Sequence, residues 1–542
     1  MYTSAFNTIK PSAKRWIYVY LYLLDQFSKS TFSDLIKIES VSLDLLTNAS
    51  YDIKCKKQAL LLVEKLRNKK KITLTEANRF LHLVFSSQNE HISKRKYVTQ
   101  KYKLHTVLDA EFTNGLVSDE ERVSSAFNTG IKLIRQVSTS WSNRINNVID
   151  VVAGIEDDYN IINSGFTKDF PGFISFNINS SPSVIGEQLV HESTHLMFDN
   201  ILFFNKQIRK FILDLPPVFS IFAQKPRTAE LVIHGLFSYT SVYLFWDSLE
   251  KNKLGDYQLA KKRKQYVLKY IQNAIVNLNN ILSEQEWVKL RNIYKSISPL
   301  SVNLIWQVPT KRKLSGSQFI TNGSKYFNEI ELAEILLASK GNKVSRVSKP
   351  VKALSPIIQL LNLFNINYCF SSYLFQSTND NNIRNFSNVI TAIHNLDSHV
   401  NELSMDIHIY FSAKKIDLKK AFILDQQDAC GDLFKIPKCC QKYFIENWND
   451  AVQNYGGDLV RQLNKDQAII INGKQALYSP TGMYFGKGLC WHFKCSDNCA
   501  ATRMLIQSRI KSLSSHKSFL KKLLPKSNVQ ISYSKKDGYK MI

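Results

Sequence analysis

The sequence predicts an α+β protein that is predominantly helical, with a small sheet beside a metal-binding helix and a cysteine-rich α+β domain near its C-terminal end. Three observations support this expectation. Several long stretches have apolar residues three and four positions apart, which is the spacing of helices that bury one face. The stretch His191–His195 carries two histidines one helical turn apart. Six of the 8 cysteines lie between Cys430 and Cys499.

The composition is that of an ordinary globular protein. Of 542 residues, 44% are hydrophobic, 12% aromatic and 21% charged, which argues against a disordered or collagen-like chain. The length suffices for two or more domains with large cores. The formal net charge of +26 fits either a nucleic-acid-binding protein or an enzyme with an acidic substrate. No zinc finger or other nucleic-acid-binding motif accompanies the charge, so we expect solvated basic surfaces and no nucleic-acid partner.

No signal-peptide pattern precedes the first helical stretch. The most apolar long run, Leu231–Trp246, contains His234 and is shorter than a membrane-spanning segment. We therefore expect a cytoplasmic protein without a membrane partner. In that reducing compartment the cysteines are thiols, metal ligands or redox groups rather than a disulfide framework.

Residues 1–145 are predicted to form a helical N-terminal region. Helical spacing occurs in Ile17–Phe27, Ala59–Leu66, Leu74–Val84 and Arg122–Ile134. The histidines of this region are isolated from one another and from other chemical groups. We therefore predict no site here.

A small sheet is expected to begin after residue 146. Asn147–Ala153 and Phe173–Asn179 are predicted strands, and the second alternates apolar and polar residues. Asn163–Gly172 is rich in turn-forming residues and is expected to be a loop. The second strand leads directly into the helix with the histidine pair, and a strand in that place could pair with an extended peptide.

The motif helix is predicted to start near Ser181 and Pro182, because serine caps helices and proline suits their first turn. On this helix the imidazoles of His191 and His195 leave the same face, so they can bind one metal ion, with Glu192 beside them. The alternative is a helix whose two histidines have no role as ligands.

A second helix is expected to open at Pro226 and to run through Trp246. Three polar residues, Arg227, Glu230 and His234, interrupt its apolar sequence at spacings that place them on one face. A buried polar face costs free energy unless it is paired or bound. This face is therefore expected to look into a polar site, unless Arg227 and Glu230 simply pair with each other.

Two residues compete for the place of third metal ligand. With Glu230, the ligand set is that of zinc peptidases, and Glu192 is then the general base for a zinc-bound water. With His234, three neutral ligands suit iron(II) and a chelating dianion. Arg227 then has a purpose, because its guanidinium can pair with the far carboxylate of 2-oxoglutarate.

Three segments resemble, in order along the chain, the HExxH-type peptide-modifying proteins. They are Asn163-Ser-Gly-Phe with Phe170-Pro-Gly-Phe-Ile-Ser, then Gln188-Leu-Val-His-Glu-Ser-Thr-His-Leu, then Arg227 with Ile233-His-Gly-Leu-Phe. Members of that family are iron(II)- and 2-oxoglutarate-dependent β-hydroxylases of ribosomally synthesised, post-translationally modified peptides (RiPPs). The resemblance covers roughly residues 145–250.

The resemblance implies a metal-dependent dioxygenase with a zincin-like sheet beside the metal-binding helix. Iron would be held by His191, His195 and His234, with Arg227 as the anchor of 2-oxoglutarate and a precursor peptide as substrate. Glu192 would orient a ligand or the substrate. The rival readings are a zinc metallopeptidase that uses Glu230, and a non-enzymatic peptide- or nucleic-acid-binding scaffold with a structural metal.

Further helices, Tyr266–Leu282 and Glu284–Ile297, are expected to complete a catalytic domain of residues 146–340. The basic, turn-rich stretch Ser339–Pro350 suggests a linker at 341–352. A C-terminal domain of residues 353–542 follows, with a helix at Ala353–Phe364 and a strand at Ile407–Phe411.

The cysteines of the C-terminal domain fall into two clusters. The residues expected to form a second metal site, holding zinc or an iron–sulfur cluster, are Cys430, Cys439, Cys440, Cys495 and Cys499, with His492 as an alternative ligand. Buried structural thiols are the equal alternative. The Ile-Pro-x-Cys-Cys and His-x-x-Cys-x-x-x-Cys segments resemble a small cysteine-containing domain of unknown function, which implies no activity.

Overall fold

The structure is a computed structural model that describes residues 96–98 and most of residues 117–541. Within the second range it leaves out 118, 150, 167–172, 301–304, 307–314, 342, 378–389, 397–404, 426–430, 456–458, 464, 466–468, 473–477, 479–487, 491, 497, 524–529 and 535–537. The helices expected at Ile17–Phe27, Ala59–Leu66 and Leu74–Val84 lie outside the described residues.

The chain forms two compact units, and neither is a continuous stretch of sequence. The first draws its described residues from Met1–Phe211, His234–Ile271 and Val288–Trp306, and the second from Ile212–Ile233, Gln272–Trp287 and Gln307–Ile542. The sequence suggested domains that follow one another. The structure instead shares residues 212–306 between the two units.

The first unit contains a sheet of four strands in the order β1-β2-β4-β3. These strands are β1 (Lys96–Val98), β2 (Val151–Ile155), β3 (Ser164–Phe166) and β4 (Phe173–Asn177). β1 and β4 run parallel to β2, whereas β3 is antiparallel to β4. The expected strand Phe173–Asn179 is confirmed. The loop prediction for Asn163–Gly172 is wrong at its start, where β3 lies.

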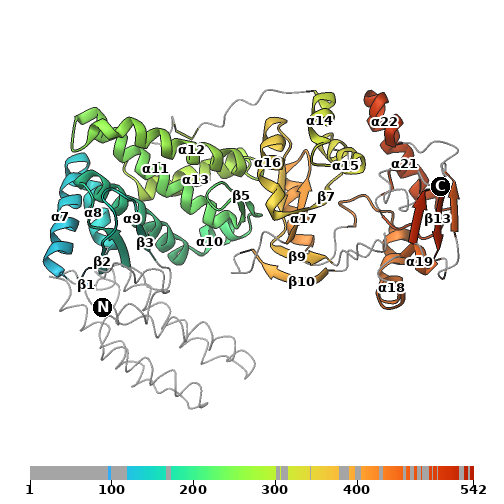
Figure 1. Cartoon of the computed structure of the whole chain (residues 1–542), viewed down its shortest axis with the longest axis horizontal. Helices are drawn as coiled ribbons and strands as arrows, with labels where there is room; N and C mark the ends of the chain where they lie inside the picture. Colours follow the sequence, from blue (N-terminus) through green and yellow to red (C-terminus); the bar gives the residue numbers. More distant parts are fainter. Residues whose placement is uncertain are drawn as a thin grey trace, which may run out of the picture. The chain divides into compact units, whose positions relative to one another are not determined.

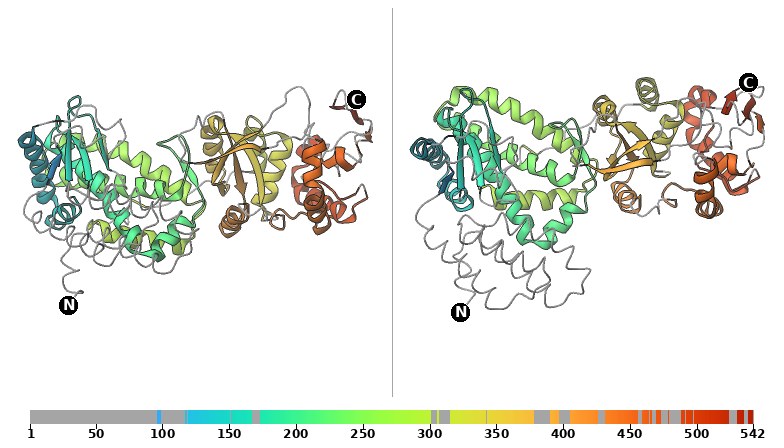
Figure 2. Two further views of the ribbon diagram at one scale, coloured as in Figure 1. Left: turned by 90° about the horizontal axis from the view of Figure 1, so that it is seen from below. Right: turned by 60° about the horizontal axis from the view of Figure 1, so that its bottom comes forward.

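Helices α7 (Glu120–Val137) and α9 (Pro182–Phe204) cover one face of this sheet, and α8 (Thr139–Val148) packs against both (Figures 1 and 2). The rings of Phe127 on α7 and Phe176 on β4 are 6.3 Å apart. Phe176 pairs with Ser164 across the sheet, so both side chains point to this face. The prediction of a helix at Arg122–Ile134 is confirmed by α7. The strand expected at Asn147–Ala153 starts later, because α8 continues to Val148.

The motif helix α9 begins as expected after Ser181, which is extended, with Pro182 in the first turn. The Ser181 side chain makes no capping hydrogen bond. Farther along α9, a Cβ added to Gly186 would lie 2.7 Å from the ring of Phe245 on helix α11 (Ala229–Asn252). Only a residue without a side chain allows the two helices to approach so closely.

The helix expected to open at Pro226 begins three residues later. Pro226 lies instead in strand β6 (Lys225–Arg227), which pairs with β5 (Val218–Ser220) in a two-stranded sheet. Arg227 is therefore a strand residue, and the prediction that it shares a helix face with Glu230 and His234 is wrong. The motif helix α9 ends at Phe204, and a separate helix, α10 (Lys206–Leu213), follows it.

Two long helices follow α11. After the short 3-10 turn η2 (Tyr257–Leu259) come α12 (Ala260–Leu278) and α13 (Glu284–Ile297). The bounds of α13 are those expected from the sequence, whereas α12 starts and ends earlier than expected. Among the described helices, none combines the length and the apolar character that crossing a membrane requires.

The second unit is built around a sheet in which β11 (Asp406–Phe411) pairs with β7 (Ser345–Pro350), β8 (Tyr368–Phe370) and β9 (Tyr373–Ser377), while β10 (Ile390–Asn395) pairs with β9. β7 corrects the linker prediction, because half of the basic stretch 341–352 is a paired strand. Helices α14 (Gly316–Gly323), α15 (Glu329–Ser339), η3 (Val351–Ala353), α16 (Leu354–Leu363) and α17 (Lys415–Asp425) accompany the sheet. The expected helix Ala353–Phe364 and strand Ile407–Phe411 are confirmed by α16 and β11.

The chain ends in helices α18 (Lys438–Tyr455), α19 (Leu459–Leu463), α21 (Ala500–Leu513) and α22 (Lys517–Leu523), with the 3-10 turn η6 (Ser514–His516). Strands β12 (Ile469–Asn472), β13 (Gln530–Ser534) and β14 (Gly538–Met541) form an antiparallel sheet. One apolar core joins residues of α15, α16, β11, α21 and α22. The described chain is thus mostly helical with small sheets, as expected.

Candidate functional site

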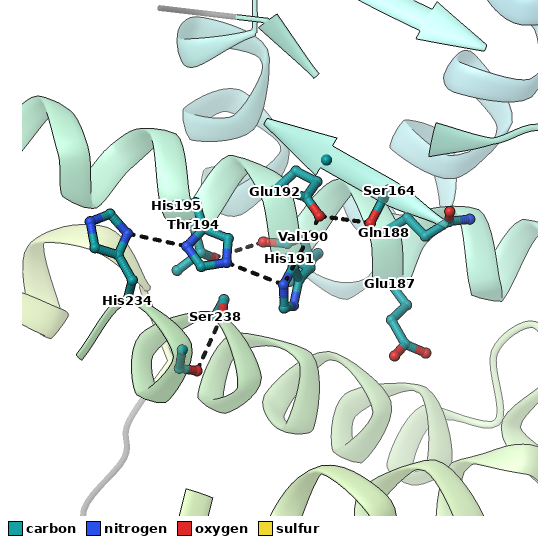
Figure 3. Close-up of polar contacts among 12 residues, drawn as sticks. Ser164, Glu187, Gln188, Val190, His191, Glu192, Thr194, His195, His234 and Ser238 are labelled. Carbon is teal, nitrogen blue, oxygen red and sulfur yellow. Dashed lines mark hydrogen bonds and ion pairs between the residues drawn. The ribbon is translucent and has the colours of Figure 1, made fainter. Parts of the chain in front are cut away.

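Three histidines from two helices lie in contact in the first unit. His191 and His195 come from α9, and His234 comes from α11 (Figure 3). The Nε2 atoms of His191 and His195 are 3.2 Å apart, and the Nδ1 atoms of His195 and His234 are 3.1 Å apart. The structure therefore brings together all three histidines that the sequence nominated.

The spacing of the first pair is suited to a metal ion. Two nitrogens, each ~2.1 Å from one metal at an angle of about 100°, lie about 3.2 Å apart. His191 and His195 have this separation, as expected for residues one helical turn apart on the same face.

The three imidazoles form a row, because His195 faces its two neighbours with opposite ring nitrogens. In the described part of the chain, the donor atoms of these three histidines do not all lie within 4.8 Å of one another. In the arrangement seen here, His195 can share a metal with His191 while its Nδ1 contacts His234. A rotation of the His234 or His195 ring would be needed for all three nitrogens to meet at one point.

Burial keeps His191 neutral. It lowers the pKa of His191 to about 4, so the imidazole carries no proton on one nitrogen at neutral pH. A neutral imidazole is the form that coordinates a metal.

Glu192 lies beside the histidines and is held by the sheet (Figure 3). Ser164 on β3 donates a 2.7 Å hydrogen bond from its Oγ to Oε1 of Glu192. The same oxygen is 4.0 Å from Nε2 of His191. Burial raises the pKa of Glu192 to about 7, although the bond from Ser164 acts against this rise.

Aromatic rings enclose the histidine row. Phe166 on β3 stacks on His195, with ring centres 4.8 Å apart and planes 7° from parallel. Phe198 meets His234 edge-on at 4.6 Å, and Tyr239 meets His191 at 5.0 Å. Phe198 could have been found as the residue one turn beyond His195. Phe166 and Tyr239 lie close to the histidines only through tertiary packing.

Arg227 and Glu230 fall in the second unit, whereas the three histidines fall in the first. Arg227 ends strand β6, and Glu230 lies in the first turn of α11. Their roles as an anchor for 2-oxoglutarate and as an alternative ligand therefore remain predictions from the sequence.

A second cluster lies in the second unit. The thiols of Cys439, Cys440, Cys495 and Cys499 all lie within 4.8 Å of one another, and a group of this kind can hold a metal ion. Cys430 lies outside the described residues. Cys490 stands apart, with its Sγ 3.2 Å from the backbone oxygen of His492.

Comparisons with known proteins add no assignment. No family model matches the chain, and no curated protein matches it. The arguments about function therefore rest on the two clusters.

Proposed function

We propose that this protein is an iron(II)- and 2-oxoglutarate-dependent enzyme that hydroxylates a side chain of a ribosomally synthesised peptide. The observation that carries the proposal is the 3.1 Å contact between His195 and His234. It places next to the His191–His195 pair the third histidine that the family resemblance implies.

Three imidazoles are a donor set that suits iron(II), and a rotation of the His234 or His195 ring would bring their nitrogens to one point. His191, His195 and His234 would hold iron(II), and three neutral imidazoles leave positions open for a co-substrate. Bound iron with 2-oxoglutarate would supply the oxidising power for hydroxylation. Arg227 would pair its planar guanidinium with the distal carboxylate of 2-oxoglutarate, a geometry that favours arginine over lysine.

The sheet offers a place for the peptide. β3 is the terminal strand of the order β1-β2-β4-β3 and runs antiparallel to β4. Ser164 and Phe166, two residues apart on β3, contact Glu192 and His195 of α9. An extended peptide added along β3 would thus pass beside the histidines. An edge strand beside the proposed metal-binding helix, as in the zincin-like sheet expected from the sequence, supports a peptide as substrate.

In this reading Glu192 is a positioning residue. Its carboxylate accepts the hydrogen bond from Ser164 and stands next to His191. Through Ser164 it would hold the edge strand β3 beside the metal site.

The position of Glu192 also favours one other function, a zinc metallopeptidase. Its Oε1 is 4.0 Å from Nε2 of His191, near enough to reach a water on a metal held there. Glu192 would then be the general base, with Glu230 as the third ligand in place of His234.

The deciding experiment uses the full chain, purified without oxygen, loaded with iron(II) and titrated with 2-oxoglutarate. We expect the weak visible charge-transfer band of an iron(II)–2-oxoglutarate chelate. It should be lost in His234→Ala and persist in Glu230→Ala. His394→Ala, a change on β10 in the second unit, is the matched histidine control and should keep the band.

Two results would contradict the proposal. The first is a wild-type protein that binds iron(II) but never develops the band. The second is tight metal binding that survives in His234→Ala and is lost in Glu230→Ala. The second result, together with peptide cleavage that requires Glu192, would establish the peptidase.

A further inference from the structure

The four-cysteine cluster contains three closely spaced thiol pairs. Cys439 and Cys440 are 3.9 Å apart at Sγ, and each lies 3.7 Å from Sγ of Cys499. All four, including Cys495, are free cysteines. These separations are far longer than the ~2.05 Å of a disulfide. They are close to the ~3.8 Å edge of a tetrahedron of sulfurs, each ~2.3 Å from a central zinc.

The same distances bear on the kind of metal group. An iron–sulfur cluster spreads its thiolates over two or more iron atoms, which holds some of the sulfurs well apart. Here every pair among the four lies within 4.8 Å. The set therefore fits a single ion rather than a cluster.

We propose that Cys439, Cys440, Cys495 and Cys499 bind one zinc ion in a closed tetrahedral site that ties α18 to α21. Four thiolates around one divalent ion carry a net charge of about −2, and the protein must stabilise it.

Two helix ends are placed to do so. Cys439 and Cys440 stand in the first turn of α18, which begins at Lys438. Cys499 is the residue that precedes α21 and occupies its N-cap position. Each helix N-terminus acts as roughly half a positive charge, so both dipoles favour thiolates at this point.

A buried threonine supports the sulfurs from behind. Oγ1 of Thr502 is 3.3 Å from Sγ of Cys499 and 3.4 Å from Sγ of Cys440. It is also 3.1 Å from Nε2 of His492. A thiolate only accepts hydrogen bonds, so the single hydroxyl proton must point towards the two sulfurs, shared between them, while the oxygen accepts from Nε2–H of His492. His492 is thus a positioning residue that acts through Thr502, rather than a ligand.

Between α18 and α21, the metal site would do what an apolar core does elsewhere and hold the two helices together. Cys440 and Cys499 are 59 residues apart in sequence, and both are buried. In small metal-bound regions the free energy of metal binding is also free energy of folding. Removing zinc should therefore loosen α18 from α21.

The test uses the intact chain with cobalt(II) in place of zinc. Cobalt held by thiolates gives a near-ultraviolet sulfur-to-cobalt charge-transfer band, whereas a histidine site gives none. We expect this band to saturate at one cobalt per chain in the wild type and in the double variant His191→Ala/His195→Ala. It should be absent in Cys499→Ser and kept in Cys369→Ser, whose buried thiol lies in β8. The histidine variant keeps this result distinct from the proposed enzymatic site.

Two further measurements test the site even if the Cys499→Ser variant does not fold. Titration of the wild type with an organomercurial should release one zinc per chain, because Cys439 is exposed. Thr502→Val, which keeps all four thiols, should weaken zinc binding by about 10- to 100-fold in competition with a chelator. Absence of the sulfur-to-cobalt band in the wild type would overturn the site. Isolation of the chain with a red, iron-based chromophore at these cysteines would overturn the assignment to zinc.

Discussion

Glu334, Lys343 and Arg509 are buried together in the second unit, and the titration of Lys343 should make the stability of the protein depend on pH. The Lys343 ammonium and the Arg509 guanidinium both contact the carboxylate of Glu334, the second at 3.5 Å. Burial and repulsion from Arg509 lower the pKa of Lys343 to about 7. Burial acts to raise the pKa of Glu334, but attraction to the two cations outweighs it and lowers that pKa. Since Arg509 stays charged, Glu334 keeps a partner even when Lys343 is neutral.

We predict that Lys343 makes the protein more stable as the pH rises above neutral. Its pKa is about 7 in the folded chain, against an ordinary value of 10.5. Between these values the unfolded chain binds a proton that the folded chain does not. The free energy of unfolding should therefore rise with pH, by at most about 1.4 kcal/mol per pH unit from this group.

The measurement is urea unfolding at several pH values for the wild type and for Lys343→Met. In the variant, this contribution to the rise of the free energy of unfolding with pH should be absent. Lys340→Met, which removes an exposed lysine, should keep it. Equal slopes in the wild type and Lys343→Met would show that Lys343 is protonated in the folded protein.

At the scale of elements, the fit of α9 against α11 decides how the histidines meet. Gly186 lies against Phe245, and a Cβ there would be 2.7 Å from the ring. His191 and His195 stand on the first of these helices and His234 on the second. Any force that separates the helices also separates the histidines.

We predict that Gly186→Ala lowers the free energy of unfolding by about 1 kcal/mol. Overpacking a core costs ~1–3 kcal/mol. The higher helix propensity of alanine returns up to ~1 kcal/mol of it. Gly186→Ala/Phe245→Leu should recover most of the loss, because the smaller side chain makes room. Urea unfolding of both variants tests this. An unchanged stability in the single variant would mean that the helices are not in close contact at Gly186.

The sequence predicted those elements whose signals are local. The bounds of α13 and the start of α9 follow from apolar spacing, Pro182 and Ser181. β3 and β7 were missed because they are short or polar, and only pairing with β4 and β11 makes them strands. Arg227 was placed on a helix because proline often opens one, but pairing with Val218 holds this segment in a sheet.

In the candidate sites too, some residues have a local signal in the sequence and others are brought together only by the fold. His191 and His195 follow from their spacing within one helix. His234 was found because a polar residue interrupts an apolar helix. The contact of Phe166 with His195, and the gathering of Cys439 and Cys499, depend on the approach of distant segments. No local pattern of residues reports such an approach.

At the scale of the whole molecule, the second unit depends on segments from the middle of the chain. Phe219 belongs to the same apolar core as Leu337 and Ile409. Asn277 donates a 2.8 Å hydrogen bond to the backbone oxygen of Phe219 and accepts one of 2.9 Å from the hydroxyl of Tyr368. Neither Phe219 nor Asn277 lies in the C-terminal part of the sequence.

We therefore predict that residues 307–542, expressed alone, do not fold to the native state. The fragment lacks Phe219 and leaves the buried hydroxyl of Tyr368 without Asn277. It should lose near-ultraviolet circular dichroism and unfold without a cooperative transition, whereas the full chain should show both. A fragment that unfolds cooperatively, with the stability of the full chain, would contradict this.

The residues of this core come from distant parts of the sequence, so they are synthesised at different times. Phe219 leaves the ribosome long before Leu523, the most C-terminal member of its core. At ~5–20 residues per second, the interval lasts about 15 to 60 s. Until the end of that time the apolar core around Phe219 is incomplete, because its last members have not been made. The newly made chain should consequently depend on chaperones that shield apolar surfaces until translation ends.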